Sequence, residues 1–148
     1  MANNNLISEF VPVKRDTALG DQLEELYAIA FSDQMPNNLS SEHFALVESG
    51  GLMRNILAGA SVFYNGPTRA TLDYIAVQPN LQRQGYGLGR KLLTHIEDRL
   101  YQEGVRKLEL TSSQDSIAFY EKLGYSSASA IKRNEMYKAL PQPMHTVV

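Results

Sequence analysis

The chain contains no cysteine among its 148 residues. Disulfides, thiolate metal sites and a cysteine nucleophile are therefore excluded. An acyl group cannot be held on a cysteine between two half-reactions. The histidines are scattered without the spacing of metal ligands, at His43, His95 and His145. We therefore expect no metal and no covalent cysteine intermediate.

The chain also lacks a strong charge and a long apolar run. Its 14 Lys and Arg residues against 16 Asp and Glu residues give a net charge of −2, which argues against non-specific binding of nucleic acid. No apolar run approaches the length of a membrane span, and residues 1–5 are polar, without the apolar core of a signal peptide. We expect a cytoplasmic protein with neither a nucleic-acid nor a membrane partner.

Apolar periodicity predicts a mixed α/β fold with one domain over residues 1–148, in which residues 1–5 and 141–148 are flexible ends. Strands are expected over residues 6–14, 52–64, 69–77, 105–111, 125–130 and 134–140. Helices are expected from Asp16 or Thr17 to Phe31, from the glycines near residue 88 to about 103, and from Ser113 or Asp115 to 123. Residues 41–49 fit either a short helix capped by serine or a strand over 44–48, and we favour the helix. Gly59, inside a predicted strand, indicates a bulge or a close approach.

The sequence Gln82-Arg83-Gln84-Gly85-Tyr86-Gly87-Leu88-Gly89 joins the strand over 69–77 to the central helix. Glycine lets a ligand approach the backbone closely. The first turn of a helix has N–H groups without an intrahelical partner, at the positive end of the helix dipole. Together these features predict an anion site, most often for phosphate. The dinucleotide pattern G-x-G-x-x-G fails at Arg90, and no Gly-Lys-Ser/Thr follows as a Walker loop would require.

The pattern Q-x-x-G-x-G, formed by Gln82, Gly85 and Gly87, resembles the acetyl-CoA pyrophosphate loop of the GNAT family, the Gcn5-related N-acetyltransferases. A second segment, from Asp115 to Tyr125, is similar to the family sequence N-x-x-A-x-x-F/Y-Y-E-K-x-G-F/Y. The second match departs from the family at Asp115, where Asn is common. The resemblance covers residues 52–140, and the N-terminal third matches only in the order of its elements.

This resemblance implies a single mixed, splayed sheet with helices on both faces, and direct acetyl transfer from acetyl-CoA to an amine. It implies that Tyr120 donates a proton to the leaving sulfur, which suits a phenol of pKa ~10. The backbone N–H of Val77 or a neighbour is the expected oxyanion donor. The expected cofactor-binding residues are Ile75, Ala76, Val77, Gln82, Arg83, Gln84, Gly85, Tyr86, Gly87, Leu88, Gly89, Asp115, Ala118, Phe119 and Tyr120. Many relatives dimerise, so the resemblance also allows a homodimer.

The general base is open at this stage. Thr71, Asp73, Ile75 and Val77 share one face of the strand by its period of two, and Asp73 is its one carboxylate. Asp73 can take the amine proton, or it can form a charge pair or an acceptor contact. Two other functions also stay open, a non-catalytic CoA-binding module of the same fold and a nucleotide-binding domain unrelated to CoA. The acceptor is expected to be an amine of a small molecule or peptide, with a slight preference for a cationic one.

Overall fold

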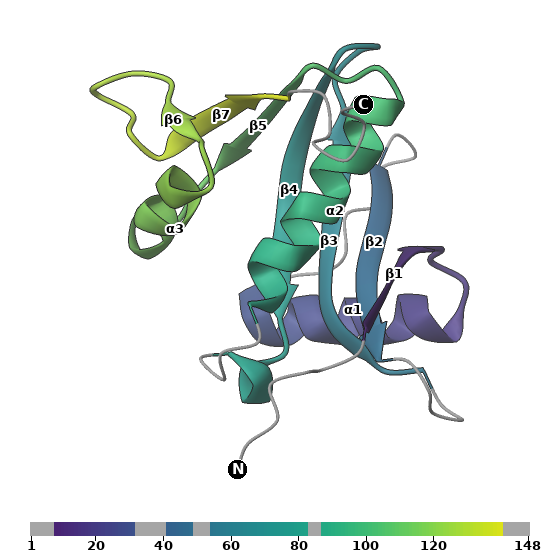
Figure 1. Cartoon of the computed structure of the whole chain (residues 1–148). Coiled ribbons are helices and arrows are strands. Elements are labelled where there is room, and N and C mark those ends of the chain that lie inside the picture. Colours follow the sequence, from purple (N-terminus) through teal and green to yellow (C-terminus); the bar gives the residue numbers. More distant parts are fainter. Residues whose placement is uncertain (1–7, 32–40, 49–53, 83–86, 141–148) are drawn as a thin grey trace. The chain divides into compact units, whose positions relative to one another are not determined.

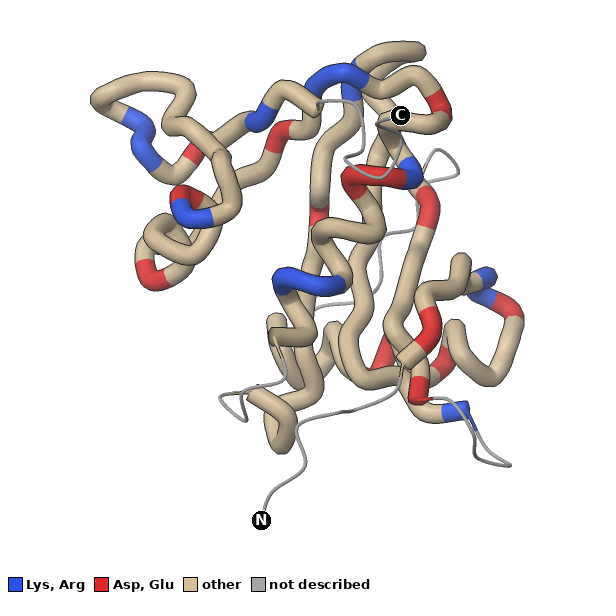
Figure 2. Tube along the Cα trace, viewed as in Figure 1, with Lys and Arg blue, Asp and Glu red and all other residues tan. Residues whose placement is uncertain are grey.

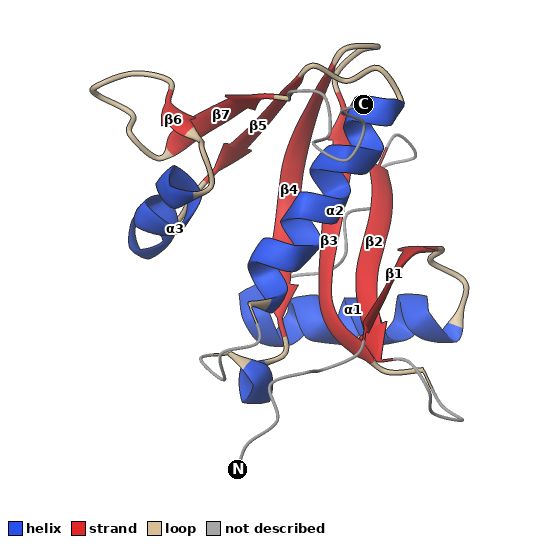
Figure 3. Ribbon diagram, viewed as in Figure 1, coloured by secondary structure: helices blue, strands red, loops and turns tan. Residues whose placement is uncertain are grey.

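The computed structural model describes residues 8–31, 41–48, 54–82 and 87–140 (Figure 1). The strands are β1 (Ser8–Val13), β2 (Ser41–Glu48), β3 (Ile56–Tyr64), β4 (Arg69–Val77), β5 (Lys107–Thr111), β6 (Ser126–Ser127) and β7 (Glu135–Ala139). The helices are α1 (Ala18–Phe31), α2 (Leu88–Gln102) and α3 (Ile117–Lys122), with short 3₁₀ turns at Pro79–Leu81 and Gln114–Ser116 (Figure 3).

The described strands form one open sheet in the order β1-β2-β3-β4-β5-β7-β6. The β4–β5 pair is parallel, whereas β1–β2, β5–β7 and β6–β7 are antiparallel. The β4–β5 ladder runs from Arg69 opposite Lys107 to Leu72 opposite Leu110, and β4 continues beyond it to Val77. The sheet is therefore mixed, and β4 leaves β5 partway along its length, as the predicted fold class requires.

The contacts divide the chain into two compact units, and β3, β4 and α2 each contribute to both. The first unit holds residues up to Val62 and Tyr74–His95. Its core joins α1 to β1, β2, β3 and the end of β4 through Val11, Val13, Leu23, Leu26, Tyr27, Ala45, Val47, Ile56 and Ala76. A side chain on Gly59 would overlap Leu23 of α1, so this glycine allows a close approach of helix to strand.

A buried polar chain crosses the first unit. The Tyr27 hydroxyl lies 2.8 Å from Ser61 Oγ, and His43 Nδ1 lies 2.6 Å from the same oxygen. All three side chains are buried, so this chain satisfies polar groups that would otherwise be costly inside the core. His43 is thus a packing residue of the first unit.

The second unit holds Phe63–Asp73 and the chain from Ile96 onward. Its buried apolar side chains come from α2, β4, β5, α3 and the β7 region, and include Leu72, Ile96, Leu100, Leu108, Leu110, Ile117, Met136 and Leu140. Gly104 ends α2 with a φ of 102°, where the Val105 N–H donates to the Leu100 carbonyl.

Three local predictions were wrong. Residues 41–48 form a strand rather than a helix, because β1 pairs along their length and Phe44–Val47 are all buried. Side-chain capping of the short helix by Ser113 or Asp115 does not occur, since the 3₁₀ turn leads into α3 and Ser113 Oγ donates to Ser116 Oγ. The strand expected over 125–130 is reduced to the two residues of β6.

The other element predictions hold to within a few residues, including α1, β3, β4, α2 and β5. Thr17 caps α1 as expected, because the Gly20 N–H donates to its hydroxyl at 3.0 Å. The predicted flexible ends, 1–5 and 141–148, lie outside the described residues. In the described part of the chain, no helix combines the length and apolarity that crossing a membrane requires.

Candidate active site

The end of β4 is held by one backbone hydrogen bond and two hydrogen bonds from glutamine side chains. The Gln78 N–H donates to the Leu57 carbonyl at 3.0 Å, and Gln78 Nε2 donates to the Ile56 carbonyl at 3.2 Å. Gln82 Nε2 donates to the Val77 carbonyl at 3.0 Å across the 3₁₀ turn. The motif glutamine, Gln82, therefore holds the turn that leads from β4 into the glycine-rich segment.

Gly87 begins the entry into α2. Its φ is 65°, a left-handed conformation that favours glycine, and its carbonyl accepts the Lys91 N–H at 2.9 Å. The N–H groups that precede Lys91 in this first turn have no partner within the helix. Beyond the neighbouring backbone of the chain itself, no atom of the described residues lies within 4 Å of the point where a Cβ on Gly87 would stand. An anion can thus approach the backbone here, as the motif requires.

The other glycine-loop residues behave in two ways. Leu88 is the buried first residue of α2, and Gly89 is the second residue of that helix. Arg83, Gln84, Gly85 and Tyr86 lie outside the described residues. The first turn of α2 is blue in Figure 2, because it holds Arg90 and Lys91. Elsewhere in the described part of the chain, red and blue segments are scattered over helices, strands and loops in Figure 2.

The alternation along β4 follows the predicted period of two. Ala70, Leu72 and Ala76 are buried, whereas Asp73 is exposed. Because the Ala76 side chain is buried, Ala76 can contact a ligand through its backbone only. Ile75 and Val77 are half-buried, on the face of the strand that they share with Asp73. Partial burial raises the pKa of the Asp73 carboxyl above its ordinary value. That direction makes the carboxylate a stronger base at neutral pH.

Tyr120 is the buried tyrosine of α3, with 7% of its surface exposed. Burial raises the pKa of its phenol to about 12, because a phenolate is poorly solvated there. The ring makes edge-on contacts with Phe119, at 5.1 Å between centroids, and with Tyr125, at 5.7 Å. Phe119 is 38% exposed, and Ala118 and Asp115 are also exposed. The phenol thus stays protonated at neutral pH, as a proton donor must.

The structure assigns the predicted site residues to both units. Val77, Gln82, Gly87, Leu88 and Gly89 belong to the first unit with Ile75 and Ala76, whereas Asp73, Asp115, Ala118, Phe119 and Tyr120 belong to the second. The structure also contains a cluster in the second unit that we did not predict. The Tyr125 hydroxyl donates to Glu97 at 2.7 Å, and Lys138 Nζ contacts the same carboxylate at 2.9 Å. Tyr125 lies in a recognised motif, but no sequence signal connects it to Glu97 or Lys138.

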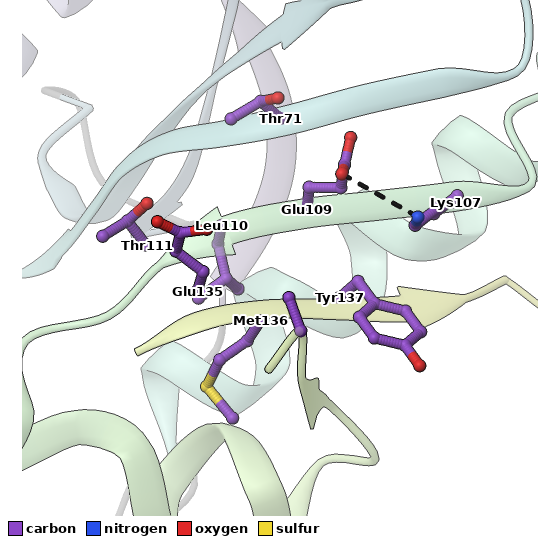
Figure 4. Close-up of a pocket in the computed structure, with 9 residues that line it drawn as sticks. Thr71, Lys107, Glu109, Leu110, Thr111, Glu135, Met136 and Tyr137 are labelled. Atoms are coloured by element: carbon purple, nitrogen blue, oxygen red, sulfur yellow. Dashed lines mark ion pairs between the residues drawn. The ribbon is translucent and has the colours of Figure 1, made fainter. Parts of the chain in front are cut away.

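A pocket of about 510 Å³ lies on the second unit (Figure 4). Its walls come from β4, β5, β7 and the segment before β7, through Thr71, Lys107, Glu109, Leu110, Thr111, Ala128, Glu135, Met136 and Tyr137. The Glu109 carboxylate pairs with Arg69 at 2.7 Å and with Lys107 at 3.9 Å, and Glu135 pairs with Lys132 at 3.6 Å. The pocket lining holds two carboxylates and one ammonium group, and each carboxylate is paired with a cation. Sequence reasoning did not identify it, because its walls come from segments far apart in the chain.

Comparison with known proteins gives one family. A family model described as the acetyltransferase (GNAT) family matches residues 10–125. The [ribosomal protein bS18]-alanine N-acetyltransferase of Escherichia coli K12 is 50% identical over 68 residues, which cover 44% of this chain and 44% of that protein. The match therefore spans less than half the length of that relative.

Solved structures show the same fold. The crystal structure of the ribosomal-protein-S18-alanine N-acetyltransferase from Escherichia coli aligns with a TM-score of 0.70 and 24% identity, over 96% of this chain and 99% of that chain. An aminoglycoside 6'-N-acetyltransferase complexed with coenzyme A aligns with a TM-score of 0.67 and 17% identity, over 91% and 99%. These relatives are N-acetyltransferases, in agreement with the predicted enzyme class. The chain belongs to the acetyltransferase (GNAT) family.

Proposed function

We propose that this chain is an N-acetyltransferase that moves an acetyl group directly from acetyl-CoA to an amine. The observation that carries this proposal is the family match over residues 10–125, which contains the glycine-rich segment and the helix with Tyr120. The absence of cysteine supports direct transfer, because no thiol is present to accept the acetyl group. A relative of the same fold was crystallised with coenzyme A, which supports acetyl-CoA as the donor.

The proposed CoA site uses the backbone more than side chains. The pyrophosphate would accept hydrogen bonds from N–H groups of the segment from Gln82 to Gly89, at the positive end of the α2 dipole. The left-handed backbone of Gly87 and the open space beside it support this assignment. Ile75, Ala76 and Val77 would hold the acyl end through the backbone, with a Val77 N–H on the carbonyl oxygen. Asp115, Ala118 and Phe119 are proposed as further contacts.

The proposed chemistry needs two proton transfers. Asp73 takes a proton from the acceptor amine, directly or through water, and its raised pKa supports this role. The amine nitrogen then bonds to the acetyl carbon, and the bond between that carbon and sulfur breaks. Tyr120 gives its phenolic proton to the departing sulfur, which leaves as a neutral thiol. The resulting phenolate then regains a proton from solvent, and Asp73 releases its proton to solvent. Burial keeps the phenol protonated before the reaction.

The acceptor is proposed to be a primary amine of a small molecule or a peptide. The names of the relatives suggest two probes, a peptide with an N-terminal alanine and an aminoglycoside. We also propose a cytoplasmic location, to be checked by fractionation of cells that produce the chain. A homodimer, which the family resemblance allows, would be detected by sedimentation of the purified protein.

Turnover with acetyl-CoA is the test of this proposal. The purified chain is incubated with acetyl-CoA and a panel of amines, and free thiol and acetylated amine are both measured. We expect thiol release that depends on the amine. Tight CoA binding in calorimetry without turnover on any amine would instead identify a non-catalytic CoA-binding module, and binding of NAD or ATP in place of CoA would indicate a different nucleotide-binding domain.

Replacing Tyr120 by Phe tests the general acid. The change removes the phenolic oxygen and leaves the buried ring in place. General-acid contributions are ~10²–10⁴-fold in rate, so we expect kcat to fall by at least about ten-fold even if water partly substitutes. KM for acetyl-CoA should change little. Tyr101→Phe on α2 is the matched control, since it removes a phenolic oxygen elsewhere in the same unit, and an unchanged kcat for Tyr120→Phe would contradict the assignment.

A further inference from the structure

The ion pair between Lys138 and Glu97 differs from the others in the described part of the chain. Its atoms are 2.9 Å apart, and the side chains are 21% and 15% exposed. In seven other ion pairs of the described residues, both side chains are at least 29% exposed. A pair this sheltered is costly to break, because the remaining charge is left without a partner. Its geometry is therefore held more firmly than that of a surface pair.

The same two residues also bind the segment that follows α3. Lys138 Nζ donates to the Leu123 carbonyl at 2.8 Å. The Tyr125 hydroxyl donates to the second oxygen of the Glu97 carboxylate at 2.7 Å. Lys138 Nζ also lies 5.6 Å from the centre of the Tyr125 ring. Lys138 of β7 and Glu97 of α2 thus hold the chain on both sides of Gly124.

Gly124 makes room for this arrangement. Its φ is 98°, and a Cβ at this position would lie 3.3 Å from Lys138 Cε. The glycine thus lets the chain turn left-handed at the end of α3 while the lysine passes beside it. The motif glycine and the lysine on β7 therefore belong to one structural arrangement.

This held segment carries the contacts of Tyr120. The Leu123 N–H and the Tyr125 N–H both donate to the Tyr120 carbonyl, at 3.0 and 3.1 Å. The Tyr125 ring makes an edge-on contact with the Tyr120 ring. Because α3 has only six residues, it is too short to be stable without tertiary contacts. The position of the Tyr120 ring thus depends on the residues that hold the end of α3.

We propose that Glu97, Tyr125 and Lys138 are positioning residues that hold α3 so that the Tyr120 hydroxyl meets the reacting sulfur. This inference rests on the proposed function of Tyr120. None of the three is assigned a contact with substrate, and each acts through the end of α3. A displacement of about 1 Å in a catalytic group can cost ~10²-fold in rate.

Lys138→Met is the principal variant. It removes the bonds to Glu97 and to the Leu123 carbonyl while keeping an unbranched side chain beside Gly124. We expect kcat to fall about ten-fold to one hundred-fold, with KM for acetyl-CoA within about two-fold of the parent value, because the proposed CoA site lies in the glycine-rich segment. Lys132→Met is the matched control, since Lys132 forms an exposed pair with Glu135 in the same hairpin, and its kcat should match the parent's.

A double variant separates an effect on the position of α3 from an effect on the thermal stability of the protein. Lys138→Met alone leaves the Glu97 carboxylate sheltered and unpaired, whereas Glu97→Gln with Lys138→Met removes both charges. We expect the double variant to regain most of the lost thermal stability while kcat stays low, since the hold on Leu123 is still missing. A kcat equal to the parent's in this double variant would overturn the proposal.

The effect of Lys138→Met on kcat in the Tyr120→Phe variant is a second test of the positioning role. If Lys138 acts through the Tyr120 hydroxyl, Lys138→Met should lower kcat by less than about two-fold in that background, because the two changes remove one function. A full additional loss would contradict the positioning role. This comparison separates positioning from a general weakening of the fold.

A measurement without activity separates this inference from the proposed function. We expect amide hydrogen exchange at Leu123 and Tyr125 to become roughly ten-fold faster in Lys138→Met and to stay unchanged in Lys132→Met. Faster exchange in a chain without any acetyl transfer would support the anchoring and refute the proposed function. Unchanged exchange in an active enzyme would refute the anchoring alone.

Discussion

Two ionisable side chains in the second unit respond to burial in ways that suit opposite roles. The pKa of Tyr120 rises to about 12, so this group holds its proton at neutral pH. The pKa of Asp73 also rises, but from the ordinary range of a carboxylic acid, so this group gains proton affinity. Desolvation is the cause in both cases. Burial therefore makes Asp73 a stronger base and keeps Tyr120 protonated, while the higher pKa also makes the phenol a weaker acid.

The titration of Tyr120 can be observed directly. With ¹³Cζ-labelled tyrosine, one resonance that disappears in Tyr120→Phe should titrate at about pH 12, compared with ~10 for a free tyrosine. Because the folded pKa is raised, the associated stability is present below pH ~10 and is lost as the pH rises toward about 12. Loss of the Tyr120 proton thus cannot cause a fall in kcat below about pH 11. A resonance that titrates at pH ~10 would contradict the effect of burial.

The lowered pKa of the His43 imidazole predicts that the folded chain loses stability in acid. Burial, and secondarily the charge of Arg15, lower the pKa of His43 from its ordinary value of 6.5. The unfolded chain then binds more protons than the folded one just below pH 6.5. The free energy of unfolding should therefore fall as the pH drops from 6.5 toward the folded pKa, and this contribution is fully present above pH 6.5.

Urea unfolding at several pH values between 5 and 8 measures the effect of His43. His43→Gln should flatten the acid limb of the stability curve while it keeps a polar group near Ser61. His95→Gln, at an exposed imidazole on α2, is the matched control for the loss of a histidine. An acid limb that survives unchanged in His43→Gln would assign the loss of stability to other groups.

At the scale of elements, the start of α2 carries the most specific requirement. Gly87 is left-handed, and it stands in open space relative to the described residues. The backbone angle, rather than crowding, thus explains the glycine in the free protein. The left-handed backbone at this turn links its local geometry to the proposed CoA site.

Gly87→Asn tests that link. Asn tolerates a left-handed backbone better than other side chains, so the fold should survive while its side chain enters the proposed pyrophosphate position. We expect CoA affinity in calorimetry to fall by at least about ten-fold, or ~1.4 kcal/mol. Gly104→Asn, at the other end of α2 with a φ of 102°, is the control for backbone strain, and CoA binding should be unaffected. Equal affinity for the folded Gly87→Asn protein and the parent would contradict the loop assignment.

At the scale of the whole molecule, the amino-acid composition favours a kinetic mechanism in which both substrates bind before the acetyl group is transferred. A chain without cysteine lacks the most nucleophilic acceptor for an acetyl group, so donor and acceptor should be bound together. Initial rates at varied concentrations of both substrates should give intersecting lines in double-reciprocal plots rather than parallel ones. Isolation of an acetylated enzyme that passes its acetyl group to the amine would contradict this ternary mechanism.

The sequence by itself determined the elements that local patterns encode. The apolar period of α2, the alternation along β4 and the glycine at 87 act over a few residues, so they could be interpreted without knowledge of distant contacts. The family motifs are local for the same reason. They identified the family, and the role that they imply for Tyr120 stays a prediction, as does the role of Asp73, which was proposed as the one carboxylate of its strand.

Only the tertiary structure decided the features that depend on distant partners. Residues 41–48 have no decisive local preference, and they form a strand because β1 pairs along them and the core covers their apolar run. Lys138 and Glu97 are 41 residues apart, and His43 and Ser61 are 18 apart, so neither contact has a sequence signature. The pKa directions of Tyr120, Asp73 and His43 arise from desolvation, which depends on what the rest of the chain packs around each group.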